Sequence, residues 1–188
     1  MLKIISGDFK GRKLEVPQNF VRPTSALKRE AIFSIIESFA IKNSIELYNN
    51  KTVIDLYAGT GAIGLEAISR GMSKAFFYEN NRQVIKILKK NCLKICSRAK
   101  FEIIEQDIMT STLDLYKNKI SLIFIDPPYE KYNISLVIEK ILSSNLTNSE
   151  TLIVIEESNK IKLTVPNKLI LIKKKNYNRT SLYFLKCI

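Results

Sequence analysis

The fold is decided by the stretch Asp55-Leu56-Tyr57-Ala58-Gly59-Thr60-Gly61-Ala62-Ile63-Gly64, which joins an apolar run to a helical pattern. Its glycines allow a tight turn and let a ligand approach the backbone closely. Their spacing matches the Gly-x-Gly-x-x-Gly fingerprint of dinucleotide-binding folds, although such a match is weak alone. Asp55 ends the strand four residues before Gly59, where it can meet a cationic amino group, and the dinucleotide fingerprint needs no acid there. The stretch therefore predicts a strand, a ligand-binding loop and a helix.

Strands and helices alternate from residue 51 onward. We expect strands at residues 52–56, 74–78, 101–105, 120–125 and 151–155, with helices at residues 62–70, 81–95 and 132–142 and a short one near Leu113. Two last strands, at residues 168–174 and 181–185, flank the hairpin-like turn Asn176-Tyr177-Asn178. This alternation predicts an α/β fold with a mainly parallel sheet covered on both faces, to which the hairpin adds an antiparallel strand.

The first 42 residues depart from this pattern. We expect short strands around a glycine-containing turn at Gly7 and Gly11. A helix should follow, with Thr24 or Ser25 as its N-cap, and run to about residue 39. The chain is therefore divided into an N-terminal extension, residues 1–42, and a main domain, residues 43–188.

A second motif, Asp126-Pro127-Pro128-Tyr129, follows the apolar strand at residues 120–125. The prolines cannot donate backbone hydrogen bonds and hold the backbone rigid, so the strand must stop there. A carboxylate, a carbonyl of fixed direction and an aromatic ring then lie together. That set suits a nucleobase with an exocyclic amine, whose two hydrogens the Asp126 carboxylate and the Pro127 carbonyl can accept while Tyr129 stacks on the ring. The alternative is a strand-terminating turn that carries a surface acid.

Acids stand at the ends of successive strands. Glu79 ends the second strand, where an acid accepts hydrogen bonds from the hydroxyls of an adenosine ribose. Asp107 follows the third strand and could accept from an adenine amine. Parallel strands place Asp55, Glu79, Asp107 and Asp126 along one carboxyl edge, which is where open α/β sheets bind ligands. Each acid alone could be a solvated loop residue, but four at successive strand ends indicate a binding site.

Composition restricts the class of protein. The 188 residues carry a formal charge of +12 and a pI of about 9.6, which favours RNA or DNA as a partner, although the many Lys, Ile and Asn residues are also typical of an AT-rich genome. No apolar run approaches the ~20 residues of a membrane span and the apolar part of the N-terminus is too short for a signal peptide, so we expect a cytoplasmic protein. The chain has no His, which excludes catalytic triads, and its three cysteines are expected to pack in the core without a zinc site.

Motifs along nearly the whole chain resemble those of one family. The opening, the segment before the first helix, the glycine loop and the second motif all take part. On these the chain resembles the AdoMet-dependent class I methyltransferases and, more narrowly, the RsmD-type family of bacterial small-subunit ribosomal RNA guanine-N2 methyltransferases. One departure is Asn178, where the family tends to carry Gly, and Asn tolerates a positive φ second best. The motifs are Ile4-Ile5-Ser6-Gly7-x-x-Lys10-Gly11-Arg12-x-Leu14, Arg22-Pro23-Thr24, Arg29-Glu30-Ala31-Ile32-Phe33, the stretch at residues 55–61, Gly64-Leu65-Glu66-Ala67 and Asp126-Pro127-Pro128-Tyr129.

The resemblance implies a seven-stranded, mainly parallel, doubly wound (Rossmann-like) methyltransferase sheet with an antiparallel C-terminal hairpin and a small N-terminal β/helix extension. It implies that S-adenosyl-L-methionine (AdoMet) lies over the glycine loop, with its ribose on Glu79 and its adenine near Asp107. The implied partner is small-subunit (16S) ribosomal RNA, within the 30S particle or its assembly intermediates, and we expect a monomer without membrane or metal. The cofactor-binding residues are expected to be Asp55, Tyr57, Gly59, Thr60, Gly61, Gly64, Glu79 and Asp107.

For the chemistry, we expect Asp126, Pro127 and Tyr129 to hold and activate the guanine N2 amine, which needs no strong base. The densest basic segment before residue 43 is interpreted as an RNA-facing arm, and the alternative is a solvated strand and helix face. Arg22-Pro23-Thr24 could instead close over the methionine end of AdoMet. The arm consists of Lys10, Arg12, Lys13, Arg22, Lys28 and Arg29.

Four other classes stay open from the residues alone. An adenine-N6 methyltransferase acting on DNA or RNA would use the same strand-end motif, since adenine also presents an exocyclic amine. A protein glutamine methyltransferase is disfavoured because that family carries Asn in place of Asp126. A dehydrogenase would need hydride-transfer residues that the second motif does not supply. A non-enzymatic RNA-binding module would not need the strand-end acids.

Overall fold

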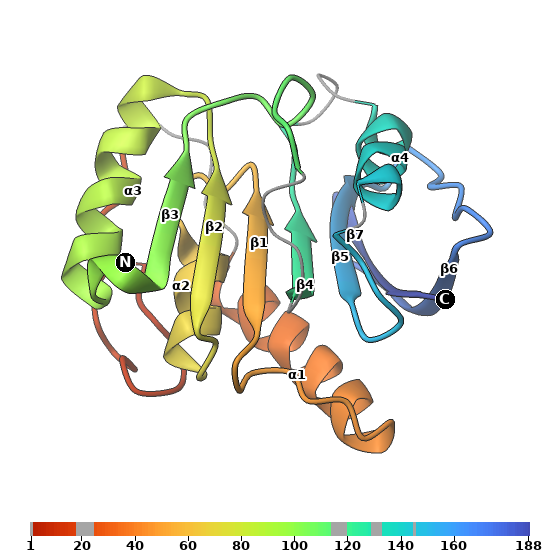
Figure 1. Ribbon diagram of the computed structural model, residues 1–188, viewed down its shortest axis with the longest axis horizontal. Coiled ribbons are helices and arrows are strands. Elements are labelled where there is room, and N and C mark those ends of the chain that lie inside the picture. The colour runs from red at the N-terminus through yellow and green to blue at the C-terminus, as the bar shows by residue number, and fades with distance from the viewer. Residues whose placement is uncertain (1, 18–24, 114–119, 129–132, 145) are drawn as a thin grey trace.

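The computed structural model describes residues 2–17, 25–113, 120–128, 133–144 and 146–188. Seven strands form a single sheet in the order β3-β2-β1-β4-β5-β7-β6 (Figure 1). Strands β1 to β5 run parallel to one another, and β7 pairs antiparallel with both β5 and β6. The expected fold, a mainly parallel sheet with an antiparallel C-terminal hairpin, is therefore confirmed. The strands are β1 (Thr52–Leu56), β2 (Lys74–Tyr78), β3 (Phe101–Ile104), β4 (Ile120–Ile125), β5 (Leu152–Ser158), β6 (Leu169–Asn176) and β7 (Thr180–Cys187).

Polar caps define where three of the helices begin. The side chains of Ser25, Asn81 and Asn133 each accept a hydrogen bond from a backbone N–H in the first turn of the helix that follows. Ser25 is one of the two N-caps expected, and helix α4 begins after Asn133. In the described part of the chain, the helices are α1 (Ala26–Lys42), α2 (Ala62–Ser69), α3 (Arg82–Ile95) and α4 (Ile134–Ser143), and the 3₁₀ turn is η1 (Arg98–Lys100).

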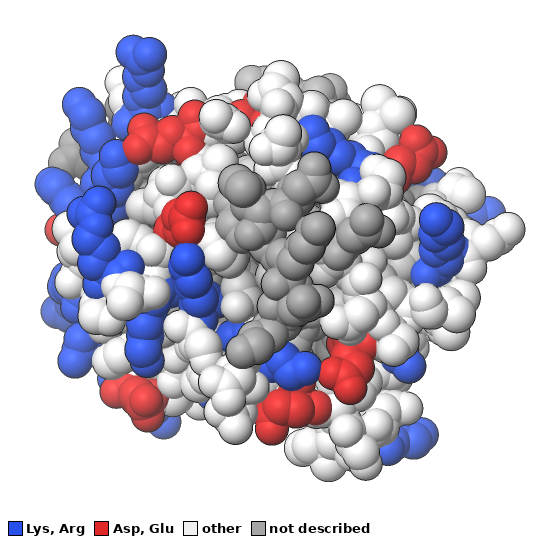
Figure 2. Space-filling model, viewed as in Figure 1, with Lys and Arg blue, Asp and Glu red and all other residues white. Residues whose placement is uncertain are grey.

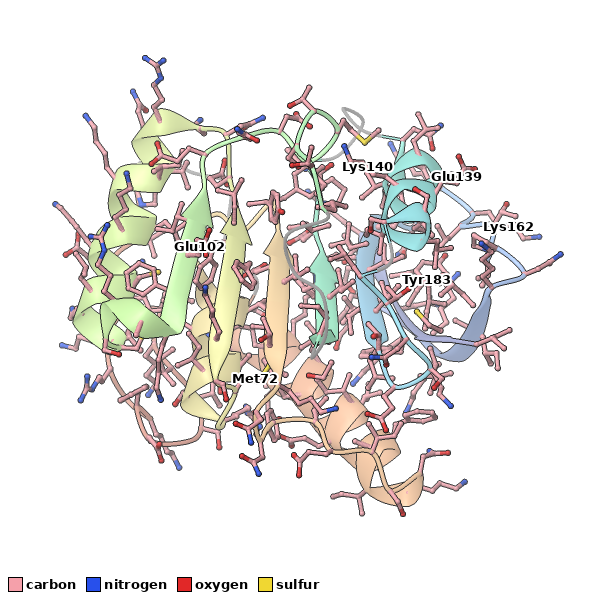
Figure 3. All side chains as sticks on the ribbon, viewed as in Figure 1. Met72, Glu102, Glu139, Lys140, Lys162 and Tyr183 are labelled. Atoms are coloured by element: carbon pink, nitrogen blue, oxygen red, sulfur yellow. The ribbon has the colours of Figure 1, made fainter. Side chains whose placement is uncertain are left out.

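The strands send alternate side chains to two separate cores. Within β1, Val53 belongs to a core that α1, α2 and α3 cover, whereas Ile54 belongs to a core that α4 covers. Both faces of the central strands are therefore buried, which explains why β1, β4 and the first part of β5 read as continuous apolar runs. Figure 3 shows side chains filling the space between the sheet and its helices, with Tyr183 of β7 on the α4 side.

The cysteines are part of these cores. Cys92, Cys96 and Cys187 are free and buried, and burial raises the pKa of each thiol. Core packing, as expected from the sequence, accounts for all three. Within the described residues, no helix combines the length and hydropathy that a membrane span requires.

The structure corrects several element boundaries. Strand β5 continues to Ser158 rather than residue 155, because β7 supplies a pairing partner as far as Thr180. No helix forms over residues 107–113, where the backbone makes a turn; residues 114–119 lie outside the described part. The expected start of a helix at Tyr132 also lies outside it. The described part of α4 begins at Ile134.

The N-terminal segment, residues 2–17, forms an isolated bridge between Lys3 and Lys13 instead of the expected short strands. Its backbone is held by side chains of α2. The fully buried carboxylate of Glu66 accepts hydrogen bonds from the N–H groups of Ile5 and Ser6, at 2.8 and 2.9 Å. The chain turns between Gly7 and Arg12, where the N–H groups of Lys10 and Arg12 donate to the carbonyls of Gly7 and Phe9, and this turn limits the pairing to one bridge.

Candidate active site

The four predicted acids lie along one edge of the sheet. Strands β3, β2, β1 and β4 are neighbours in that order, so their carboxyl ends meet at the upper edge in Figure 1. The chain leaves β1 toward β2 on one side and returns to β4 on the other, which makes this edge a topological switch point, where open α/β sheets bind ligands. The acids at these ends, in spatial order, are Asp107, Glu79, Asp55 and Asp126.

Asp55 is a buried acid near the end of β1, just before the glycine loop. It pairs in register with Phe77 and Phe124, is 2% exposed, and its Oδ2 accepts a hydrogen bond from the N–H of Gly64 at 2.9 Å. Burial raises the pKa of Asp55 to about 8, although the Gly64 N–H opposes this and the charge of Glu79 adds to it. A cationic group brought to this carboxyl would favour its ionised form.

The three glycines of the loop serve different purposes. A Cβ at Gly64 would lie 2.3 Å from Cε1 of Phe77, so Gly64 lets α2 pack directly on β2. Gly61 precedes α2 with φ of 81°, a left-handed conformation. A Cβ at Gly59 would meet no atom nearer than 4.0 Å, which leaves the backbone open to a ligand. Of the three, Gly59 therefore has the local space for close ligand approach.

Tyr57 carries backbone strain at the start of the loop. Its φ is 60°, which is unfavourable for a residue with a side chain and is found mainly where surrounding structure imposes it. The next residue, Ala58, donates its N–H to the carbonyl of Tyr78 at 2.9 Å. The loop is thus turned sharply at the end of β1 and fastened to the end of β2.

Glu79 organises the loop and the start of α3. Its Oε2 accepts from the N–H of Gly59 at 3.0 Å, and its Oε1 accepts from the N–H groups of Asn80 and Asn81. Asp107 accepts from the side-chain amide of Asn80 at 3.2 Å through Oδ2 and from the N–H of Met109 at 2.8 Å through Oδ1. Asn80, which the sequence analysis did not single out, therefore connects Glu79 with Asp107.

The second motif follows the central strand β4. Asp126 is half-buried, Pro127 is buried and Pro128 is exposed. The motif thus places a partly accessible carboxylate at the switch point, beside the glycine loop of β1. Tyr129, expected to stack on a base, lies outside the described residues, as does the whole of Arg22-Pro23-Thr24.

The expected basic arm is only partly a surface feature. Lys10, Arg12 and Lys13 are exposed, and Nη1 of Arg12 donates to the carbonyls of Lys94 and Ile95 at 3.2 and 3.3 Å. The arm is thereby fixed to the C-terminal end of α3.

The prediction that Arg29 contacts RNA is wrong. Arg29 is 1% exposed and its Nη2 donates to the carbonyl of Lys3 at 2.8 Å. Burial lowers the pKa of Arg29, and the negative charge of Glu66 opposes this. Lys28 is also engaged, because its Nζ pairs with buried Glu156 and donates to Oγ1 of Thr180 at 2.8 Å. The sequence shows only that Lys28 and Arg29 are adjacent and basic. The tertiary structure shows that Arg29 is buried and that Lys28 pairs with a buried acid.

Asn91 is a further residue that sequence reasoning missed. It is fully buried on α3, where its amide donates to the carbonyls of Glu15 and Thr60 at 3.0 Å and accepts from the N–H of Glu15 at 2.8 Å. One side chain thus connects the N-terminal segment, α3 and the glycine loop. A polar residue in the middle of an apolar helix face is the signal that could have revealed it.

This sheet order, with a glycine loop after β1 and acids at the carboxyl ends, defines the Rossmann-like fold of methyltransferases. A family model described as "Conserved hypothetical protein 95" matches residues 2–186. A relative from Buchnera aphidicola, named ribosomal RNA small subunit methyltransferase D, is 32% identical over 98% of this chain and 92% of its own. The chain belongs to this family, which is the RsmD-type family that its motifs resemble.

Solved structures show the same fold. The protein yhhF from Escherichia coli matches with a TM-score of 0.84 at 26% identity, covering 99% of this chain and 97% of that one. An RNA methyltransferase from Salinibacter ruber, in complex with S-adenosyl-L-homocysteine, matches with a TM-score of 0.64 at 12% identity, covering 88% and 94%. The second likeness concerns the fold alone.

Proposed function

We propose that this protein transfers a methyl group from AdoMet to the exocyclic N2 amine of a guanine in the 16S RNA of the small ribosomal subunit. The observation that carries the proposal is the position of Asp126 and Pro127, directly after central β4 and beside the glycine loop. Membership of a family whose relatives are named for small-subunit RNA methylation supports the class of substrate.

The loop and its acids suit AdoMet. Gly59 leaves room for close approach, Glu79 presents a carboxylate held by backbone donors to the ribose hydroxyls, and Asp107 lies on the far side of Asn80 for the adenine amine. Asp55 faces the loop from beneath, where it favours a cationic amino group. When bound, AdoMet supplies an electrophilic methyl carbon, so the protein's task is alignment and desolvation.

The residues after β4 prepare the amine. The Asp126 carboxylate and the Pro127 carbonyl each accept one hydrogen of the guanine N2, which draws its lone pair out of the ring and directs it. The same acceptors stabilise the positive charge that develops on nitrogen, because they are oriented before the reaction. The methylated amine then loses its proton easily, which is consistent with a chain that has no His. We place Tyr129 against the base, where stacking would contribute about 1–3 kcal/mol.

The remaining parts of the proposal concern the assembly. We propose that the protein acts as a monomer, without a metal, on the 30S particle or an assembly intermediate. Lys10, Arg12 and Lys13 are the members of the basic arm that the structure exposes to such a substrate. The division at residue 42 stays a prediction.

Methyl transfer from labelled AdoMet to small subunits, isolated from a strain that lacks the gene, tests the proposal. Nucleoside analysis should reveal N2-methylguanosine in the small-subunit RNA. Label in N6-methyladenosine would move the protein to the adenine-N6 class, since adenine offers the same amine to Asp126 and Pro127. Binding of AdoMet without any label in the subunit would overturn the proposed substrate.

A further inference from the structure

Helix α3 carries a row of positive charge. Basic residues recur at every fourth position along it, which places them one above another on a single helix face. All are exposed, and the helix contains no Asp or Glu. The opposite face is buried against the sheet. The row, called the α3 row below, consists of Arg82, Lys86, Lys90 and Lys94, with Lys89 beside it and Arg98 continuing it into η1.

The fold itself does not account for this row. Within the described residues, Lys89 pairs with Glu105 and Lys90 lies 3.9 Å from Glu15, while the salt bridges include none to the other members. Like charges four residues apart destabilise a helix, so the row opposes the stability of α3. General lysine richness is also insufficient, because the other long helices mix signs: α1 contains Glu30 and Glu37, and α4 contains Glu139.

The row connects the candidate active site to the exposed arm. Arg82 opens α3 directly after the Asn80-Asn81 turn that Glu79 holds at the carboxyl edge of the sheet. At the other end, about 21 Å away for a helix of this length, Arg12 is bound to the carbonyls of Lys94 and Ile95. Figure 2 shows the basic side chains gathered down the side of the molecule where Figure 1 places α3.

We propose that the outer face of α3 is the docking surface for the phosphate backbone of the RNA substrate, which it leads to the carboxyl edge. The inference rests on the proposed function, and it adds a surface that the expected arm did not include. A membrane surface fits less well, because a helix that binds lipid presents an exposed apolar face, and the apolar residues of α3 are buried apart from Leu93, with Ile87 half-buried.

The test compares two triple variants of the full chain that lose the same charge. One is Lys86→Gln, Lys90→Gln, Lys94→Gln on α3. The matched control is Lys173→Gln, Lys174→Gln, Lys175→Gln, three exposed lysines on the edge strand β6 at the other end of the sheet. Sedimentation with small subunits measures binding, methyl transfer gives kcat and KM, and calorimetry gives the Kd for AdoMet.

The α3 variant should bind subunits about tenfold more weakly. The slope of log affinity against log salt concentration should be about 2 less steep, because each of the three lost phosphate contacts contributes about 0.7. Its KM should rise while kcat and the Kd for AdoMet stay within about twofold. The β6 control should change binding by less than about twofold. Equal losses in both variants, or wild-type binding by the α3 variant, would overturn the proposal.

The two proposals fail in distinguishable ways. If the wild-type protein binds subunits but does not methylate them, the proposed function is wrong. The sedimentation of the two variants would still test whether the α3 row binds RNA. If the wild-type protein methylates the subunits and the α3 variant binds them as tightly as the wild type does, only the proposed docking surface is wrong. Wild-type protein that does not sediment with subunits at all would contradict both proposals.

Discussion

At the scale of single residues, the candidate site separates acids by environment. Asp126 is partly accessible, whereas Asp55 is buried and Glu79 is already held by three backbone donors. Three carboxylates near one edge therefore have different tasks open to them. Asp126 can contact a substrate group, and Glu79 can orient the loop and accept a hydrogen bond from a ligand. The protonation of Asp55 depends on the charge of the group that binds next to it.

Replacing Asp126 tests the first of these tasks. Asp126→Ala should lower kcat on small subunits by about 100-fold or more, the usual effect of removing one preorganised electrostatic partner of the reacting group. The Kd for AdoMet should stay within about threefold. Glu102→Ala is the control, because Glu102 (labelled in Figure 3) is an exposed acid of β3 whose carboxylate pairs with Lys74 at 2.9 Å. A near-normal kcat for Asp126→Ala would remove Asp126 from the mechanism.

Asp55 gives the stability of the ligand-free protein a pH dependence. Its pKa is raised from 3.8 to about 8, so the folded state binds a proton that the unfolded state has released. The contribution of protonated Asp55 to the free energy of unfolding is complete below about pH 4. It declines as the pH rises toward 8 and stays low at higher pH. Urea unfolding at pH 5, 6.5 and 8 should show wild-type protein losing more stability over this range than Asp55→Asn. Parallel pH profiles would mean that Asp55 is ionised in the folded protein.

At the scale of elements, the N-terminal segment and α2 form one packed unit. The N–H of Asp8 donates to the carbonyl of Ser69 at 2.8 Å, and Oγ of Ser69 donates to the carbonyl of Ser6 at 2.6 Å. Together with the buried Glu66 carboxylate, these bonds bind the segment to the helix that follows the glycine loop. The basic arm is therefore positioned by the same helix that Gly64 sets against β2.

Gly7 and Gly11 separate the effect of packing from that of backbone conformation. Their φ values are nearly equal, 78° and 83°, so a side chain at either costs about 1–2 kcal/mol in strain. A Cβ at Gly7 would also lie 1.7 Å from the carbonyl oxygen of Ser69, whereas one at Gly11 would meet nothing within 4 Å. Gly7→Ala should therefore lower the free energy of unfolding by at least about 2 kcal/mol more than Gly11→Ala. Urea denaturation of both variants measures the difference, and equal losses would show that the segment can shift away.

Most elements followed from local patterns. The bounds of β1, β2 and β4 match the predicted ranges, because a strand buried on both faces is a continuous apolar run that ends at a polar or turn residue. The end of β5 was underestimated, since Glu156, Glu157 and Ser158 are polar and pair with β7. The expected N-terminal strands were reduced to one bridge, because a hydrogen-bonded turn between Gly7 and Arg12 takes the donors that a longer ladder needs.

At the scale of the whole molecule, the N-terminal extension completes the core. Leu2, Ile4 and Leu14 lie in the same buried cluster as Ile32 and Phe33 of α1 and the inner residues of the sheet. Helix α1 covers that cluster together with α2 and α3, so removing residues 1–42 would expose part of it to water. The functional division predicted at residue 42 is therefore compatible with a shared core.

We expect residues 43–188 alone not to fold cooperatively. The lost contacts include the five buried apolar side chains Leu2, Ile4, Leu14, Ile32 and Phe33. Each contributes about 1.5–3 kcal/mol, so their sum is comparable with the whole typical margin of stability. Urea unfolding followed by circular dichroism, with the full chain as the control, measures this. A sigmoidal transition with the midpoint of the full chain would show that the second domain is independent.

The sequence by itself determined the class of fold, the glycine loop and the line of acids, because strand periodicity, glycine spacing and strand-end residues are local properties. Only the tertiary structure decided which charged side chains are buried, which are paired and which stay exposed. Arg29 and Glu66 are buried together, Lys28 is occupied by Glu156, and Asn91 ties the arm to the loop. The α3 row stays exposed. Burial and pairing depend on residues 31 to 128 positions apart coming together, which no local pattern encodes.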